Sequence, residues 1–364
     1  MRILAAAGGT AGHVNPMLAT AEKLAARGHE VIALGTADGL EADLVPAAGL
    51  ELVTIARVPL PRRPSLDLVR LPARLLTTVK QIQTIISERE IDKVLGFGGY
   101  VSAPAYLAAR LSGVPVIIQE QNARPGIANR LGARWAAAVA LTFESTPLVP
   151  KRGRVRVTGL PLRAEISALA ADVRDPARAR ARRVRACERF GLDPDEMTIL
   201  VTGGSSGAQR LNRSFSAAAQ SVTARAQVLH ITGRGKETDI AAGAEGERYR
   251  VIDYVTDIEE AYAAADLVVS RSGAGMVAEL AALGLPAVVV PLPIGNGEQK
   301  LNAAAYIESG AFHHMSDDSF TPDAVRTQII PLIDAAELAR RSEILVSAGV
   351  ANGADGVADL VEEA

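Results

Sequence analysis

Residues 3–13 read Ile-Leu-Ala-Ala-Ala-Gly-Gly-Thr-Ala-Gly-His, a short apolar run that passes directly into a glycine-rich turn. The run is shorter than a transmembrane helix or the apolar part of a secretory signal requires, so we interpret it as a buried β-strand. Glycines after a strand let backbone N–H groups approach a ligand, and a following helix N-terminus favours negative charge. The spacing fits neither the Gly-x-Gly-x-x-Gly dinucleotide fingerprint nor a Walker loop. The stretch therefore predicts a strand, a turn with room for a ligand, and a helix.

Apolar runs of this kind alternate with helix-like segments along the whole chain, which indicates parallel sheets covered on both faces. The runs predicted as strands are 3–7, 30–35, 52–55, 93–95, 116–118 and 138–141 in a first series, and 198–202, 226–231, 250–253, 267–270 and 287–291 in a second. Clear helical segments are 16–27, 66–87 and 103–111. The second series opens, like the first, with a strand and a glycine turn. We therefore predict an α/β fold of two Rossmann-like, doubly wound domains.

Composition supports two globular domains and excludes several classes of protein. The 364 residues include 48% hydrophobic and 22% charged residues, typical of a globular protein and not of a disordered one. The net charge of −2 argues against a nucleic-acid-binding protein. The one cysteine, Cys187, excludes an internal disulfide and any multi-cysteine metal site, and it indicates a cytosolic protein. Seven arginines between residues 174 and 189 are interpreted as a solvated helix face.

Four further segments carry possible chemistry. Glycine turns follow predicted strands at 96–102 and 203–209, and three such turns in all are more than packing requires. In residues 270–279 a helix begins at a glycine turn, and Glu279 inside it could accept two hydrogen bonds from a ribose diol. An ordinary exposed helix acid is the alternative for Glu279. The polar loop 293–302 has the composition to bind sugar hydroxyls. His13 places a titratable imidazole at a sheet edge where ligands bind.

These motifs, together with Glu120-Gln121-Asn122, occur in one order, and the chain resembles the MurG family of bacterial peptidoglycan glycosyltransferases, which make lipid II. The resemblance covers essentially the whole chain and implies the GT-B fold, with the active site in the cleft between two Rossmann-like domains. It implies that residues 1–162 bind the acceptor and the membrane, completed by a C-terminal helix at 343–364. Residues 163–342 would bind the donor, UDP-N-acetylglucosamine.

The implied reaction moves N-acetylglucosamine to the 4-hydroxyl of the muramyl sugar of lipid I, undecaprenyl-pyrophosphoryl-MurNAc-pentapeptide, with inversion. Such a hexosyl transfer needs a base, stabilisation of the departing diphosphate, and positioning. The residues implied at the reacting centre are His13 as candidate base, Asn122 and Arg163. Those implied to contact the donor are Thr10, Ala11, Gly12, Asn122, Arg163, Ser205, Val255, Ala274, Gly275, Met276, Val277, Ala278, Glu279 and Gln299. Those implied at the acceptor diphosphate are Gly9, Gly12, His13, Gly98, Gly99 and Tyr100.

Three positions depart from the family pattern, and no cofactor is expected. Residues 123–125 suggest a longer acceptor loop, Leu160 replaces an asparagine, and Glu298 replaces a second glutamine, which puts its sugar contact in doubt. We find no His/Cys cluster or aspartate pair that predicts a metal site, so no tightly bound metal is expected. A loosely held Mg²⁺ on the donor stays open.

A basic and apolar stretch is the candidate membrane contact. Between residues 57 and 80 the chain has six basic residues and one acid. The patch comprises Arg62, Arg63, Arg70, Arg74, Leu75 and Lys80. Because lipid I stays in the bilayer, we expect peripheral attachment to the anionic cytoplasmic face of the membrane. A solvated helix with its apolar side in the core is the alternative. Whether cell-division or elongation proteins are partners stays open.

Other interpretations of the motifs are a UDP-N-acetylglucosamine 2-epimerase, a glycosyltransferase with a different acceptor, a NAD-dependent dehydrogenase and a non-catalytic sugar-nucleotide sensor. The missing dinucleotide fingerprint disfavours the dehydrogenase. An epimerase needs no lipid acceptor, so a basic and apolar membrane face distinguishes it from the predicted transferase.

Overall fold

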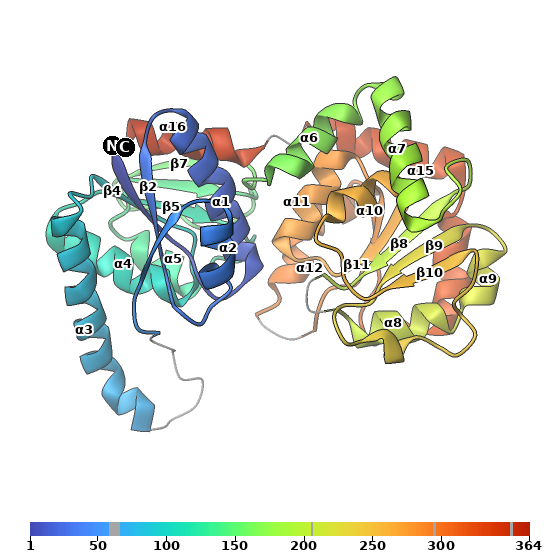
Figure 1. Cartoon of the computed structure of the whole chain (residues 1–364), viewed down its shortest axis with the longest axis horizontal. Helices are drawn as coiled ribbons and strands as arrows, with labels where there is room; N and C mark the ends of the chain where they lie inside the picture. Colours follow the sequence, from blue (N-terminus) through green and yellow to red (C-terminus); the bar gives the residue numbers. More distant parts are fainter. Residues whose placement is uncertain (58–65, 205–206, 294–295, 350–351) are drawn as a thin grey trace. The chain divides into compact units, whose positions relative to one another are not determined.

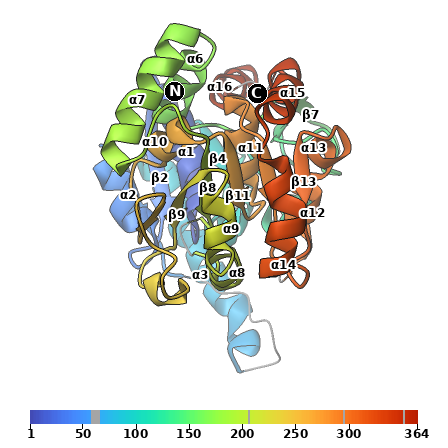
Figure 2. The same ribbon diagram turned by 90° about the vertical axis from the view of Figure 1, so that its right-hand side faces the viewer.

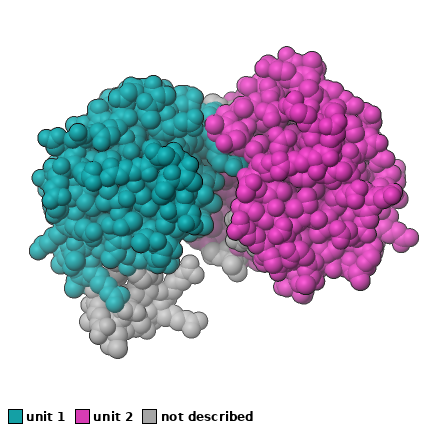
Figure 3. All heavy atoms as spheres, in the orientation of Figure 1, with its two compact units in different colours: residues 1–163, 351–364 teal, residues 164–350 magenta. Residues whose placement is uncertain are grey.

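The structure, a computed structural model, describes residues 1–57, 66–204, 207–293, 296–349 and 352–364, and of residues 66–71 it describes the backbone alone. The chain divides into two compact units (Figure 3), which are described separately. Unit 1 comprises Met1–Arg163 and Ala351–Ala364, and unit 2 comprises Ala164–Val350. The first division lies one residue from the expected one, which ended the first domain at residue 162.

Among the described residues of unit 1, seven parallel strands form one sheet in the order β3-β2-β1-β4-β5-β6-β7. Their bounds are β1 Arg2–Ala6, β2 Glu30–Gly35, β3 Glu51–Thr54, β4 Lys93–Gly96, β5 Val116–Glu120, β6 Ala138–Leu141 and β7 Arg154–Val157. The helices are α1 Ala11–Ala26, α2 Glu41–Ala47, α3 Leu66–Glu88, α4 Gly99–Ser112, α5 Ile127–Gly132 and α16 Gly353–Glu363. The order steps outward in both directions from β1 and β4, which are neighbours at the centre.

Alternate residues of β1 face opposite layers of this unit. Leu4 and Ala6 point into a core shared with α3 and α4, whereas Ile3 and Ala5 point into a core shared with α1 and α16. Because both faces are covered, the strand is apolar from Ile3 onward, as its sequence predicts. Figure 1 shows α3 and α4 on one side of the sheet and α1 and α16 on the other.

Among the described residues of unit 2, six parallel strands form a second sheet in the order β10-β9-β8-β11-β12-β13. Their bounds are β8 Thr198–Thr202, β9 Gln227–Ile231, β10 Tyr249–Ile252, β11 Leu267–Ser270, β12 Ala287–Val289 and β13 Phe312–His314. The α-helices are α6 Ala164–Asp172, α7 Pro176–Phe190, α8 Gln209–Ser216, α9 Ala219–Thr223, α10 Ile258–Ala264, α11 Ala274–Leu283, α12 Glu298–Asn302, α13 Ala304–Glu308, α14 Pro322–Ala324 and α15 Ala335–Ser347. Short helical turns lie at Glu237–Asp239, Val325–Ile329 and Ile330–Leu332. The two doubly wound domains confirm the predicted fold.

The arginine-rich stretch forms α7, whose ends follow from local sequence. The Asp175 carboxylate accepts hydrogen bonds from the N–H groups of Ala177 and Arg178, Pro176 occupies the first turn, and Gly191 ends the helix in the left-handed conformation. One of its arginines is not merely solvated. Arg183 forms an ion pair with Asp266 at 2.9 Å and donates to backbone carbonyls. Figure 2 shows α6, α7 and α10 gathered at one side of the unit.

The expected C-terminal helix at 343–364 is wrong as one element. Residues up to Ser347 belong to α15 in unit 2, and α16 returns to unit 1. The return is stabilised by burial of Val357, Ala358, Leu360 and Val361 in a core shared with α1. Ion pairs add to it, because the Arg27 guanidinium lies 2.7 Å from the Asp359 carboxylate and 3.0 Å from that of Glu362.

Two expected helices begin earlier than their prolines suggest. Helix α1 begins at Ala11 rather than Pro16, and α4 begins at Gly99 rather than residue 103. Pro16 and Pro104 lie inside these helices, where each removes one backbone hydrogen bond. Gly12 and His13 therefore lie in the first turn of α1, and Gly99 begins α4, which brings both motifs to the ends of β1 and β4.

Candidate functional site

The glycine turns of unit 1 lie where the strand order reverses. Strands β1 and β4 are paired neighbours, with Ala6 opposite Gly96, yet each connects to a helix on a different face. In open α/β sheets, ligands bind outside the carboxyl ends of the strands at such a point. The β1–α1 turn and the β4–α4 turn, separated by about ninety residues in sequence, therefore form one candidate site.

These two turns touch through their backbones at Gly8 and Gly99. Gly99 has φ +78, and a Cβ placed on it would lie 2.4 Å from the Gly8 carbonyl oxygen. Only glycine allows both this conformation and this close approach. Glycine at residue 99 is therefore needed for packing, and this contact also fixes the distance between the two turns.

His13 lies on the first turn of α1, beside the β4–α4 turn. Its Nδ1 is 2.8 Å from the Thr10 hydroxyl, and a Cβ on Gly98 would lie 3.4 Å from its Nε2. Desolvation lowers the pKa of His13 below its usual value, and the nearby Glu41 carboxylate partly opposes that shift. The imidazole is half-buried, and it is neutral at pH 7, so one ring nitrogen is available to accept a proton.

Glu41, which sequence reasoning missed, supports this site from beneath. Its fully buried carboxylate accepts hydrogen bonds from the N–H groups of Gly9 at 3.3 Å and Thr36 at 3.0 Å, and from the Tyr100 hydroxyl at 3.2 Å. Desolvation alone would raise the pKa of Glu41, but hydrogen bonds from backbone N–H groups and from the Thr36 hydroxyl hold it below its usual value. A fixed anion therefore joins the β1–α1 turn, through Gly9, to Tyr100. The Arg57 guanidinium lies 5.0 Å from the centre of the Tyr100 ring.

A second buried carboxylate shapes the loop that carries Asn122. Glu120 accepts hydrogen bonds from the N–H groups of Asn122 and Gly126, both at 3.0 Å, and from the Asn129 side chain at 2.9 Å. Desolvation raises the pKa of Glu120, while these hydrogen bonds oppose the rise. The Thr146 hydroxyl also donates to the Asn122 carbonyl. Asn122 is thus fixed at the end of β5, next to β4.

Unit 2 has a second reversal of strand order, between β8 and β11. The turn at Gly203, Gly204 and Gly207 follows β8, and the turn at residues 271–273 follows β11 and leads into α11. The predicted donor contact Ser205 lies outside the described residues. Both glycine motifs of the second half therefore lie at the same carboxyl edge, as they do in unit 1.

Helix α11 presents only part of the predicted donor set. Ala274, Val277 and Ala278 have buried side chains, so only their backbone groups could contact a ligand. Gly275, Met276 and Glu279 are partly exposed. The Glu279 carboxylate lies in the second turn of the helix, on its partly exposed side.

The remaining predicted residues lie on the loop after β10, in helix α12 and at the unit boundary. Val255 follows β10 and is partly exposed. The Gln299 side-chain oxygen accepts a hydrogen bond from the Leu292 N–H at 2.9 Å. This hydrogen bond fixes the orientation of the Gln299 amide group. Arg163 is the last residue of the first segment of unit 1 and is half-buried.

The predicted membrane patch is only partly described. Arg62 and Arg63 lie outside the described residues, and so does the side chain of Arg70. Arg74 and Lys80 are exposed on α3, whereas Leu75 packs against the core, because it lies on the inner side of this helix. The neighbouring Leu76 is 62% exposed, so Leu76 rather than Leu75 is the exposed leucine of the predicted patch. None of the helices in the described ranges is long and apolar enough to cross a bilayer.

Comparison with known proteins agrees with both halves of the fold. Residues 3–141 match the glycosyltransferase family 28 N-terminal domain, and residues 198–357 match the family's C-terminal domain. A relative from Clavibacter sepedonicus is 52% identical and one from Paenarthrobacter aurescens is 46% identical. The alignments cover 99% and 100% of this chain and 96% of each relative. Both are named UDP-N-acetylglucosamine–N-acetylmuramyl-(pentapeptide) pyrophosphoryl-undecaprenol N-acetylglucosamine transferase.

Solved structures give the same result. The crystal structure of MurG from Acinetobacter baumannii aligns with a TM-score of 0.80 at 27% identity, covering 100% of this chain and 99% of that one. The glycosyltransferase of kitacinnamycin aligns with a TM-score of 0.73 at 19% identity, covering 100% and 98%, and shows the fold alone. The fold is therefore GT-B, as the sequence predicts.

Proposed function

Because the chain belongs to glycosyltransferase family 28, we propose that it is an inverting hexosyltransferase that moves N-acetylglucosamine from UDP-N-acetylglucosamine to lipid I. The acceptor atom is the 4-hydroxyl oxygen of the N-acetylmuramyl sugar, and the product is lipid II, a precursor of peptidoglycan. The observation that carries this proposal is the pair of glycine turns at the strand-order reversal of each sheet. The two substrates each carry a diphosphate, and each sheet has one carboxyl edge with glycine turns where a diphosphate could bind.

The donor belongs to unit 2. Backbone N–H groups of the turn after β8 and of the first turn of α11 face the diphosphate, where they stabilise the charge that develops on the leaving group. Glu279 accepts hydrogen bonds from the ribose hydroxyls, and the backbone of Val255 contacts and recognises the uracil. Gln299 binds the hydroxyls of the transferred sugar through its amide nitrogen, since its oxygen is engaged by Leu292.

The acceptor belongs to unit 1, which residues 352–364 complete. The touching turns at Gly8–Gly12 and Gly98–Tyr100 cradle the lipid diphosphate, and Asn122 lies at the reacting centre. The buried Glu41 carboxylate keeps the first of these turns in place through the Gly9 N–H.

The transfer is a single displacement. The acceptor hydroxyl oxygen attacks the anomeric carbon, the bond from that carbon to the UDP oxygen breaks, and UDP leaves with the electron pair. The proton of the hydroxyl passes to Nε2 of His13, whose other ring nitrogen is held by the Thr10 hydroxyl. The low pKa of His13 keeps the imidazole neutral and able to accept that proton. Arg163 adds positive charge beside the departing diphosphate.

The protein meets its acceptor at the cytoplasmic face of the membrane. Arg74 and Lys80 are exposed on α3 beside the apolar Leu76. Each basic residue contributes about 1 kcal/mol near an anionic leaflet, and an inserted leucine adds to that. Such attachment is peripheral and reversible.

Radiolabelled UDP-N-acetylglucosamine and a short-chain lipid I analogue test the proposed reaction. We expect label in a disaccharide product that forms only when the acceptor is present. Formation of UDP-N-acetylmannosamine without the acceptor would instead identify an epimerase. Donor binding without turnover would identify a sensor. Glu279→Ala should weaken UDP binding roughly 10- to 150-fold, corresponding to about 1.5–3 kcal/mol for hydrogen bonds to a charged group.

A further inference from the structure

The Glu279 carboxylate is held from within the domain by a buried tyrosine. Tyr262, on α10, donates its hydroxyl proton to the Glu279 side chain at 2.9 Å, and the same hydroxyl lies 3.2 Å from the Met276 sulfur. The two residues belong to the helices on either side of β11 in the sequence, so the contact links α10 to α11. Neither the family motifs nor the spacing of the sequence assigns a role to Tyr262.

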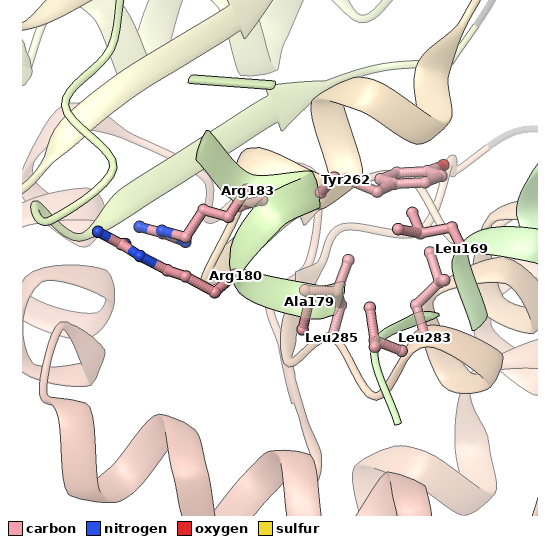
Figure 4. A pocket seen from close by; sticks show the side chains of 10 residues that line it. Leu169, Ala179, Arg180, Arg183, Tyr262, Leu283 and Leu285 are labelled. Atoms are coloured by element: carbon pink, nitrogen blue, oxygen red, sulfur yellow. The ribbon is translucent and has the colours of Figure 1, made fainter. Parts of the chain in front are cut away.

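The surroundings of Tyr262 fix its ring and leave its hydroxyl directed at Glu279. The residue is 2% exposed, and its ring borders an apolar cavity lined by Leu169, Leu283 and Leu285. Figure 4 shows the ring at the edge of this cavity, with Leu169 and Leu283 near its hydroxyl end and Arg180 and Arg183 at the other side. Arg183 is engaged by Asp266 and by backbone carbonyls, so it does not compete for the tyrosine hydroxyl.

We infer that Tyr262 is a positioning residue for the donor, which orients the Glu279 carboxylate toward the 2′- and 3′-hydroxyls of the UDP ribose. This inference rests on the proposed function, in which Glu279 binds that ribose. A carboxylate has about four acceptor positions on two oxygens, so it can accept hydrogen bonds from a tyrosine hydroxyl and from ribose hydroxyls at the same time. The buried tyrosine restricts rotation of the carboxylate before the nucleotide arrives, and such preorganisation raises affinity.

The test is Tyr262→Phe, which removes one hydroxyl and keeps the ring beside the cavity. Calorimetry with UDP and with 2′,3′-dideoxy-UDP separates the ribose contact from the rest of the nucleotide. We expect the variant to bind UDP roughly three- to tenfold more weakly, which is a usual effect of losing one hydrogen bond. We expect it to bind the dideoxy nucleotide with the same affinity as the wild type. In a Glu279→Ala background, the same change should have no further effect on UDP affinity.

Tyr249→Phe is the matched control. Tyr249 is 1% exposed in the same domain, and its hydroxyl is 2.7 Å from Nδ1 of His230 rather than near Glu279. This control should leave the affinity ratio of the two nucleotides unchanged even if it lowers stability.

Three results would overturn the inference. If Tyr262→Phe weakens both nucleotides equally, Tyr262 has only a structural role. If the variant binds both UDP and the dideoxy nucleotide with wild-type affinity, the Tyr262 hydroxyl does not position Glu279. If wild-type protein binds UDP and the dideoxy nucleotide equally, the ribose assignment of Glu279 itself fails, and the inference fails with it. Wild-type transfer activity, measured separately, distinguishes that failure from failure of the proposed reaction.

Discussion

Replacing Gly99 with alanine should separate the two glycine turns of unit 1. Alanine at φ +78 costs about 1–2 kcal/mol in the left-handed region. Its Cβ would also lie 2.4 Å from the Gly8 carbonyl oxygen, whereas a comfortable C···O contact needs about 3.3 Å. The turns must therefore move apart by roughly 1 Å, and a displacement of that size in a catalytic site costs about 10²-fold in rate. We expect Gly99→Ala to lower kcat/KM for the lipid I analogue by about that factor.

Gly113→Ala is the matched control, since it carries the same backbone cost without the close approach. Gly113 ends the same helix, α4, with φ +72, and a Cβ placed there meets no atom within 4 Å. Both variants should lose about 1–2 kcal/mol of stability in denaturant unfolding, with a larger loss for Gly99→Ala. Calorimetry should show unchanged UDP binding by both, because the donor belongs to unit 2. Equal kcat/KM for the acceptor in the two variants would refute the assignment of these turns to the acceptor diphosphate.

Three shorter predictions follow from the charged and titratable groups. If His13 is the base, the acidic limb of the pH–kcat profile lies below pH 6.5, because desolvation lowers its pKa, and His13→Ala loses the limb and about 10²–10⁴ in kcat. A His13→Ala enzyme that keeps the limb would assign the base elsewhere. Reversing the charges of Arg74 and Lys80 to glutamate should weaken sedimentation with anionic vesicles at low salt, whereas Arg225→Glu in unit 2 should not. Equal binding by both proteins would move the membrane contact away from α3. Burial lowers the pKa of His230 to about 3, so the folded state favours its neutral form. The resulting stability is full above pH 6.5 and declines as pH falls toward 3. Denaturant titrations at pH 7 and pH 4.5 should show this decline in wild type and a smaller one in His230→Gln.

The strands that sequence predicts best are those buried on both faces. The bounds of β2, β6, β8 and β11 match the predicted runs residue for residue, because continuous apolar sequence is what two covering layers require. The edge strands β7 and β13 were missed. Their sequences, Arg-Val-Arg-Val and Phe-His-His, are short and partly polar, since an edge strand pairs on one side only and meets solvent.

The sequence predicts the positions of the glycine turns, which depend on the local backbone, but not the contacts that tertiary packing adds around them. Glycine turns have a local signature, so residues 8–13, 98–100 and 270–279 were found from sequence. Glu41 lies 32 residues from Gly9, and only the pairing of β2 with β1 brings its helix beneath that turn. Val277 and Ala278 show the converse, because a motif includes them although their side chains face the core. Motif spacing does not reveal which side of a helix is exposed.

The return of α16 to unit 1 gives the protein an unusual order of assembly during synthesis. The first 163 residues leave the ribosome long before residues 353–363, which cover the face of the first sheet at α1. Until then Val14, Met17 and Leu24 lack the partners that Val357 and Leu360 provide, and exposed apolar surface of that kind invites aggregation. Unit 2, by contrast, is continuous in sequence. We therefore expect unit 2 to reach its native state before unit 1, whose core is incomplete until α16 has been synthesised.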